Sequence, residues 1–474
     1  MDELEEALAS MQTAWLAGRS ALDAVPPAWR NATGRDEIAA LALAGHAAEV
    51  LSYPVPSTVL REIPLLPALA VALLPDAFRG RFRRLLALIR KDGALESALI
   101  AFVLSRGYAA HPADWMPGVR DDWVPDVYGP WLDWVRTDQS RVAPDEIITP
   151  DNYDHWSWQD KRRRLADLRI SDPAAAREII AAKAASEPAD RRLILAGLLG
   201  AGLSELDVPF LEVLAGDRSV RVQALAAGLL GRLGRGAGNT AFAEELAASV
   251  ELRSAGLLLR RKKLFFVELK TRPQKLRRSE LFGLVSLRDL SAALGVEESL
   301  LLQSLPEGSA SDLQDFVACV ATSGTEASVR SLIALLLAEK DAAGSLLVPL
   351  AERLTDPDQQ ALVASYSSRD TDLFATTFQL AGAWTGRLPL KSVAASPSYQ
   401  TMSEHLDAIV RGAEKTMATA ENLLPSALLR LGLLLESAGA RALLAACVGR
   451  GMSPADPRLE MLEFNIELQR EPST

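Results

Sequence analysis

A dense basic run lies between Leu257 and Arg278 and reads LLLRRKKLFFVELKTRPQKLRR, with Glu268 as its one acidic residue. Cationic side chains at this density bind acidic protein surfaces or, less readily, nucleic-acid phosphates. The run therefore predicts a docking patch for a partner. Its residues are Arg260, Arg261, Lys262, Lys263, Lys270 and Arg272.

A second interpretation of the same run stays open. The segment LFFVEL, beginning at Leu264, has the β-branched and aromatic composition of a short strand, so a hairpin could interrupt the helices here. The run would then be a solvated, charged connector in which LFFV is buried.

Other residues of catalytic type lack the spacing that chemistry needs. The chain has no HExxH or GxSxG motif, and its histidines, His46, His111, His155 and His405, are far apart in sequence. The tract GRLGRGAGNT follows a helical pattern and has no Gly-Lys-Ser/Thr end, which favours a helix-terminating turn over a phosphate loop. We expect no catalytic residue.

Two further groups of residues favour structural roles. Asp151, Asp154, His155 and Asp160 could bind a cation, but a polar turn that caps the helix after Trp156 is the commoner structure. Each cysteine, Cys319 and Cys447, lies in an apolar helical run, which favours a buried, reduced thiol. We expect no metal and no cofactor.

The elements that would position any site are helices. Ala and Leu dominate the chain, and Ser204–Gly234 forms two amphipathic helical patterns joined at Gly216-Asp217. The pentapeptide AGLLG occurs at 196–200 and again 31 residues later. Two helices per repeat at this interval are typical of an α-solenoid.

Within that unit we expect a defined packing pattern. Small residues would let neighbouring helices approach, and larger ones would form the interlocking apolar face. Asp217 would cap the second helix, and Arg221 would reach the acidic edge of an adjoining unit. The small residues are Ala226, Ala227, Gly228 and Gly231, and the apolar ones are Leu211, Leu214, Val220 and Leu230.

A tryptophan-rich segment precedes the repeats, and such segments are seldom flexible because each indole buries a large area when ordered. We interpret it as an irregular packed connector, with an aromatic ligand site as the alternative. Its residues are Trp115, Trp123, Trp131, Trp134, Trp156 and Trp158.

We therefore predict an all-α protein, chiefly a HEAT-like α-solenoid with an N-terminal helical subdomain and a Trp-rich irregular connector. The expected parts are an N-terminal helical subdomain at 1–106, the Trp/Pro-rich connector at 107–156, HEAT-like repeats at 157–256, a basic connector at 257–280 and C-terminal helical repeats at 281–474.

The unit from Asp217 through Val220-Arg221 to Leu233 resembles HEAT and bilin-lyase-like repeats. More widely, residues 100–240 resemble an uncharacterised bacterial family with a domain of unknown function. The residues that carry this likeness include Trp158, Arg162-Arg163-Arg164-Leu165, Asp172-Pro173, Glu187, Asp190-Arg191 and Asp217-Arg218. Members of that family are encoded beside SWIM zinc-finger proteins, MoxR-type AAA ATPases and von Willebrand-type domain proteins. The resemblance implies an accessory role and supplies no catalytic residues.

The functional hypothesis is a non-catalytic protein-interaction scaffold or adaptor whose partner is another protein, such as a MoxR-type AAA ATPase or a von Willebrand-type domain protein. The alternative is a HEAT-like DNA repair enzyme of the alkylpurine glycosylase kind, built on Trp156, Trp158, Asp160 and Arg164. A net charge of −10 argues against broad contact with nucleic acid. The acidic amino terminus and the short, proline-interrupted apolar stretch at Ile63–Pro75 predict a cytoplasmic chain with no membrane span.

Overall fold

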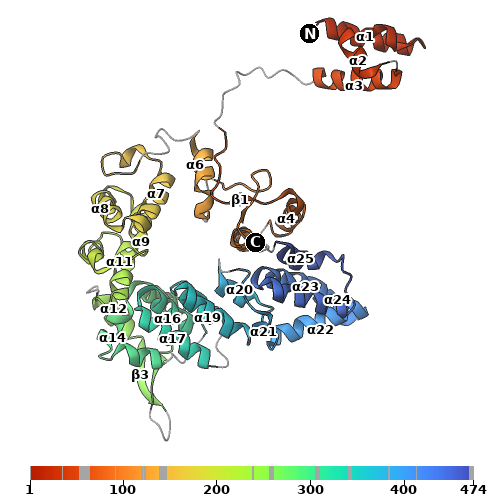
Figure 1. Ribbon diagram of the computed structural model, residues 1–474. Helices are drawn as coiled ribbons and strands as arrows, with labels where there is room; N and C mark the ends of the chain where they lie inside the picture. The colour runs from red at the N-terminus through yellow and green to blue at the C-terminus, as the bar shows by residue number, and fades with distance from the viewer. Residues whose placement is uncertain are drawn as a thin grey trace, which may run out of the picture. The chain divides into compact units, whose positions relative to one another are not determined.

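The computed structural model divides the chain into two compact units, Met1–Leu65 and Leu66–Thr474 (Figure 1). The first unit ends well before residue 106, where the sequence analysis places the end of an N-terminal subdomain. The structure describes residues 2–34, 36–52, 65–90, 92–118, 121, 124–137, 147–236, 240–255, 261–304, 310–339, 344–382, 385–412 and 414–468.

The first unit is a small helical assembly. Helix α1 (Asp2–Leu16) packs against η1 (Ala21–Ala24) and α3 (Glu37–Ser52). A carboxylate oxygen of Glu37 accepts a hydrogen bond from the Ala21 amide at 2.7 Å, which ties the start of α3 to η1. The core of this unit is formed by Met11, Ala21, Val25 and Ala40.

The second unit is built from helical pairs. The pairs that correspond to the predicted repeats follow one another along the chain and lie side by side in Figure 1. They comprise α7 (Trp158–Ser171), α8 (Pro173–Lys183), α9 (Ala189–Leu198), α10 (Val208–Ala215) and α11 (Val220–Arg232). The all-α class predicted from the sequence is thereby confirmed; one continuous solenoid stays a prediction.

A β-hairpin interrupts the helices, as the composition of LFFVEL indicates. Strand β3 (Val250–Ala255) pairs antiparallel with β4 (Arg261–Phe266), so that Val250 lies opposite Phe266. The expected HEAT-like region at 157–256 thus ends in a strand. The expected connector at 257–280 holds β4 and, after Thr271, most of helix α13 (Arg272–Leu284).

The later helices again form packed pairs. They include α16 (Ala310–Ser323), α17 (Glu326–Ala338), α18 (Val348–Ala351), α19 (Asp356–Ser367), α20 (Ala375–Ala381), α22 (Pro397–Arg411), α23 (Glu414–Leu434), α24 (Ser437–Gly449) and α25 (Glu460–Glu467). Each of α7, α9, α11, α16, α18, α20 and α23 contacts the next in that order.

The two ends of the second unit pack together. Helix α4 (Asp76–Ile89) lies against α25, and the rings of Phe82 and Phe464 are 6.4 Å apart (Figure 1). Arg84 donates to Glu460 at 2.7 Å across the same contact. Strand β1 (Ala72–Leu73), which precedes α4, pairs in parallel with β2 (Tyr108–Ala109).

Two hydrophobic cores fill the second unit. One contains residues between Ile148 and Leu230, from the predicted repeats. The other joins residues between Leu74 and Trp131 to residues between Ala243 and Leu468. The two cores meet beside helix α11, and an open groove lies at this boundary.

Candidate functional site

The predicted docking patch is spread over several elements. Arg261, Lys262 and Lys263 lie on β4, where their backbone pairs with Ala255, Ser254 and Arg253. Arg260 lies outside the described residues. Lys270 and Arg272 are exposed, one before α13 and one at its first position.

The aromatic part of the run is packed into the fold. Leu264 is fully buried, and the ring of Phe266 lies 5.9 Å from that of Phe282. Arg278, at the end of the run, is buried and donates to a carboxylate oxygen of Asp312 at 2.5 Å. The structure thus shows a packed segment within the charged connector, in which Leu264 is buried and Phe265, Phe266 and Val267 are half-buried. Lys270 and Arg272 remain as exposed basic residues of the predicted patch.

An open groove of about 720 Å³ lies along α11, at the boundary of the two cores. Its other walls come from α13 and from the carboxyl end of α16. Apolar side chains and helix backbone predominate in its lining, which comprises Leu193, Val220, Arg221, Ala224, Leu225, Gly228, Leu229, Arg232, Arg277, Glu280, Gly283, Leu284, Val285, Ala321, Thr322 and Ser323.

The prediction that Val220 belongs to the interlocking apolar face is wrong. Leu211, Leu214 and Leu230 are buried as expected, but Val220 is 44 % exposed and forms part of the groove wall. Among the described residues, no helix therefore packs along the full length of the α11 face that carries Val220. An amphipathic pattern cannot distinguish a position that meets a neighbour from one that faces an unfilled groove.

Close helix approach forms the floor of the groove. The α carbon of Gly231 lies so near α16 that an added Cβ would come within 2.6 Å of the Ser323 carbonyl oxygen. Gly228 similarly faces the Thr322 carbonyl, at 3.3 Å from an added Cβ. The small residues predicted to permit close packing have that role here.

The arginines of the groove differ in their partners. Arg221 donates to Asp190 at 3.0 Å, the contact with an adjoining unit that the sequence predicts. Arg277 donates to Glu245 at 2.9 and 2.8 Å. Within the described part of the chain, Arg232 has no carboxylate partner, and its buried Nε has no hydrogen-bond acceptor.

Burial shapes the electrostatics at this end of the groove. Burial lowers the pKa of Arg232, and the charge of Glu326 opposes that effect. Arg353 donates to the carbonyls of Ala321 and Gly324; burial, together with the neighbouring Arg232, lowers the pKa of Arg353 to about 10. Two guanidinium groups therefore lie close together here.

The repeat units are joined by arginine contacts at a regular sequence interval. Asp190–Arg221, Glu205–Arg235 and Glu245–Arg277 are 31, 30 and 32 residues apart. Arg353 and Arg369 each reach a carbonyl 32 residues earlier. This interval matches the spacing of the two AGLLG pentapeptides, so the same repeat length appears in the sequence and in the contacts.

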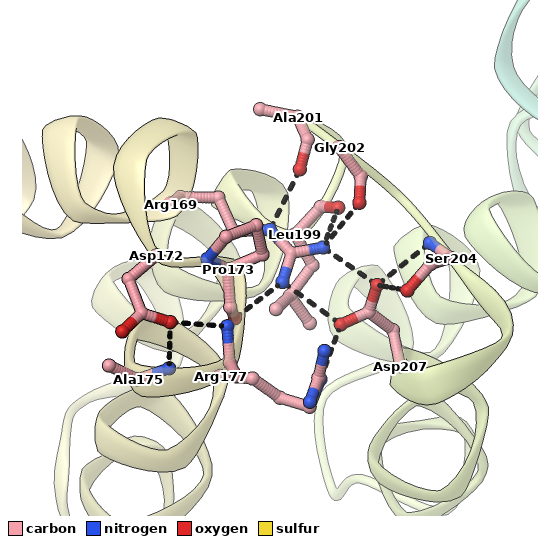
Figure 2. Close-up of polar contacts among 11 residues, drawn as sticks. Arg169, Asp172, Pro173, Ala175, Arg177, Leu199, Ala201, Gly202, Ser204 and Asp207 are labelled. Atoms are coloured by element: carbon pink, nitrogen blue, oxygen red, sulfur yellow. Dashed lines mark hydrogen bonds and ion pairs between the residues drawn. The ribbon is translucent and has the colours of Figure 1, made fainter.

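One such contact is fully buried. Figure 2 shows Arg169 of α7 directed toward Asp207, with further donation to carbonyls that follow α9. Arg177 also donates to Asp207, at 2.8 Å. Because buried carbonyls at a helix end need donors, this network is structural. The carbonyls that accept from Arg169 belong to Pro173, Leu199, Ala201 and Gly202.

The tryptophans of the connector are packed anchors. The indole nitrogen of Trp115 donates to Glu96 at 2.8 Å, and that of Trp131 donates to the Pro67 carbonyl at 2.8 Å. Trp156 is 5 % exposed, and the Arg164 guanidinium lies 4.2 Å from its ring centroid. Trp123 lies outside the described residues.

The residues considered for a glycosylase are used in local packing. Trp156 and Asp160 are both buried, and Asp160 accepts a hydrogen bond from the Ser157 hydroxyl at 2.5 Å. Arg191 lies over the ring of Trp158 at 4.9 Å. This arrangement offers a base no open stacking surface on Trp156.

The acidic cluster that the sequence analysis considers for a cation lies at the start of helix α7. The Ser157 hydroxyl accepts from the Asp160 amide and caps α7, and Asp154 accepts from Lys183 at 2.9 Å. Hydrogen bonds from Lys183 lower the pKa of Asp154. No group of three or more His, Cys, Asp or Glu side chains suited to a metal ion occurs in the described residues.

The cysteines are buried, free thiols, as predicted. Burial raises the pKa of Cys319 to about 12 and that of Cys447 to about 11. Thiols with such pKa values are poor nucleophiles at neutral pH. None of the helices in the described ranges combines the length and the apolar character that crossing a membrane requires.

These features define an all-α protein of packed helical pairs with an open groove between neighbouring pairs. Residues 6–278 match the model of a family of unknown function (DUF5691). The match covers more than half of the chain, and the chain belongs to this family. It extends beyond the resemblance at residues 100–240, since it includes most of the first compact unit and ends within α13. Neither the search of curated proteins nor the search of solved structures returned a match.

Proposed function

We propose that the chain is a non-catalytic protein-interaction scaffold that binds a partner protein through the groove along α11. The observation that carries this proposal is the groove along α11, where Val220 is 44 % exposed and Ala224 and Leu225 are half-buried, and which α9, α13 and α16 flank but leave open. Open apolar surface bordered by charged residues is typical of a binding site.

The partner class comes from the family resemblance. The bacterial family that the sequence resembles is encoded beside MoxR-type AAA ATPases and von Willebrand-type domain proteins, and we propose one of these as the partner. An accessory role in such a system needs a rigid surface and no catalytic group. The helical pairs supply that surface.

Affinity purification of the tagged chain from the organism that encodes it tests this function. The proposal expects a MoxR-type ATPase or a von Willebrand-type domain protein to elute with the chain in near-equal amounts. Elution of the chain alone, or as an assembly of its own copies, would contradict it. Tight, salt-dependent binding to an alkylated DNA duplex would instead support the repair-enzyme alternative.

The exposed basic residues form a second surface for the same test. Lys270 lies just before α13 and Arg272 is its first residue, while later residues of α13 line the groove. Replacing both by Glu, or Arg260 and Arg261 by Glu, should reduce recovery of the partner if the basic run takes part in docking. Unchanged recovery would remove the basic run from the interaction and leave the groove.

A further inference from the structure

The groove has the length of a short helix. Its lining follows α11 from Val220 to Arg232, and at 1.5 Å of rise per residue this stripe is about 18 Å long. Three turns of an α-helix have about the same length. A long apolar groove bordered by parallel helices commonly takes the apolar face of another helix.

The walls of the groove carry an excess of positive charge. Three arginines and one glutamate, Glu280, line it, whereas the whole chain has a net charge of −10. Arg221 and Arg277 are already engaged with carboxylates of the chain. Arg232 is not so engaged in the described residues, and its Nε is buried without an acceptor. The groove therefore selects for negative charge in whatever occupies it.

Arg232 also fixes where that charge must lie. It stands at the carboxyl end of α11, while Val220 stands at the other end. An occupant helix must bring a carboxylate to the Arg232 end and apolar side chains to the middle, where Leu225 and Leu284 are half-buried. A carboxylate hydrogen-bonded to a half-buried guanidinium makes a strong contact.

We propose that the groove binds an acidic, amphipathic α-helix of the partner protein, with a carboxylate of that helix on Arg232. This inference rests on the proposed scaffold function and specifies the chemistry of the partner. The partner segment should show apolar residues at three- and four-residue spacing and a Glu or Asp at its Arg232 end.

Photo-crosslinking in cells tests the position of the occupant. A benzoylphenylalanine at Val220, which is 44 % exposed in the groove, is compared with one at Val213, which is 70 % exposed on α10. The crosslinked peptide is then identified by mass spectrometry. We expect a single partner segment at Val220, acidic and amphipathic, and no crosslink to that segment at Val213.

A charge exchange tests the role of Arg232. Arg232→Glu should reduce the crosslink yield at Val220 about tenfold, and Glu→Arg in the identified helix should restore it, because the pair is then reversed. Arg387→Glu, at an exposed arginine outside the groove, is the matched control and should leave the yield unchanged. Gly283→Trp places an indole on the groove wall at a position where an added Cβ meets no atom within 4 Å, so it should occupy part of the groove while leaving Arg232 unchanged in sequence.

Several outcomes would overturn the inference. They are a basic or extended segment at Val220, a segment of this chain such as Asp2–Leu16, a yield unaffected by Gly283→Trp, or a loss at Arg232→Glu that the reversed pair does not restore. If a partner co-purifies but crosslinks only at Val213, the groove inference fails while the scaffold function stands. If no partner co-purifies, the scaffold function itself fails.

Discussion

The guanidinium of Arg169 and the carboxylate of Asp207 form a two-point ion pair in the interior of the helical array. The Nη1–Oδ1 and Nη2–Oδ2 distances are 3.0 and 2.7 Å, and both side chains are fully buried. The two residues are 38 positions apart, so the pair joins α7 to the turn that precedes α10. It fixes the spacing of the pairs that lead to the groove.

Removing one member of this pair should destabilise the protein strongly. Arg169→Met takes both of its hydrogen bonds from the buried Asp207, which keeps Arg177 and Ser204 as donors, and leaves several carbonyls without donors, which should cost about 3–5 kcal/mol. Arg235→Gln removes the Arg235–Glu205 pair, whose side chains are 53 % and 60 % exposed, and should cost no more than about 1 kcal/mol. Urea unfolding followed by circular dichroism measures both. Equal effects of the two substitutions would contradict a structural role for the Arg169–Asp207 pair.

Acidification should weaken the same pair. Burial alone would raise the pKa of Asp207, but hydrogen bonds from Arg169 and Arg177 outweigh it and hold the pKa below the ordinary value of an aspartate. A carboxyl group whose pKa is lower in the folded state stabilises the fold above its unfolded pKa of about 3.9, and that contribution is lost as the pH falls below it.

The melting temperatures of the wild type and Asp207→Asn should therefore differ clearly at about pH 6. The difference should narrow as the pH falls toward about 3, because Asp207 takes up a proton in the unfolded state, where its pKa is higher, before it does so in the folded state. Asp190→Asn, at a side chain that is 86 % exposed, provides the matched control. A gap between the wild type and Asp207→Asn that stays constant over this range would contradict the predicted coupling.

Close packing beneath the groove gives a third prediction. Gly231→Ala places a methyl group 2.6 Å from the Ser323 carbonyl, so α11 and α16 must move apart at a cost of about 1–3 kcal/mol. Gly93→Ala is the control, because an added Cβ there meets no atom within 4 Å. Thermal unfolding of both variants measures this cost. A Gly231→Ala protein as stable as the wild type would contradict close packing between α11 and α16 at this position.

Much of the fold follows from local sequence patterns. The 31-residue repetition of AGLLG and the turn at Gly216-Asp217 predict the helical pairs, and Arg221 reaches Asp190 as expected. The predicted helix start around Asp217 differs in detail. Ser219 occupies the cap position, while Asp217 accepts from the Ser219 amide and from Arg192. The Asp217 carboxylate binds both of these donors, and the spacing of residues in the sequence does not predict which donors it binds.

Other features depend on residues far apart in sequence. Helix α20 begins only at Ala375, because Leu373 and Phe374 before it adopt positive φ angles of 55° and 66°. Asp370 holds this turn by accepting from the Phe374 amide and from the Ser398 hydroxyl of α22. That partner lies 28 residues away, so no local pattern indicates it.

The groove illustrates the same limit. Val220 fits the apolar periodicity of α11 and would be expected in the core, yet it is 44 % exposed because no helix of the described residues covers it at that end of α11. Whether Arg232 has a salt-bridge partner depends on where the other helices place their carboxylates, and the described residues bring none into contact with it. Sequence periodicity therefore predicts the helices that border the groove, whereas the groove itself arises from tertiary packing.

The dissociation constant of the co-purified partner, measured for the wild type and for a variant whose groove is filled by a tryptophan, tests the central claim most directly. We predict that Gly283→Trp weakens binding by at least about tenfold, or roughly 1.4 kcal/mol, while Gly93→Trp, the same change at a glycine whose added Cβ also meets no atom within 4 Å, leaves it unchanged. Equal affinities for the wild type and the two variants would contradict the assignment of the groove along α11 as the docking site.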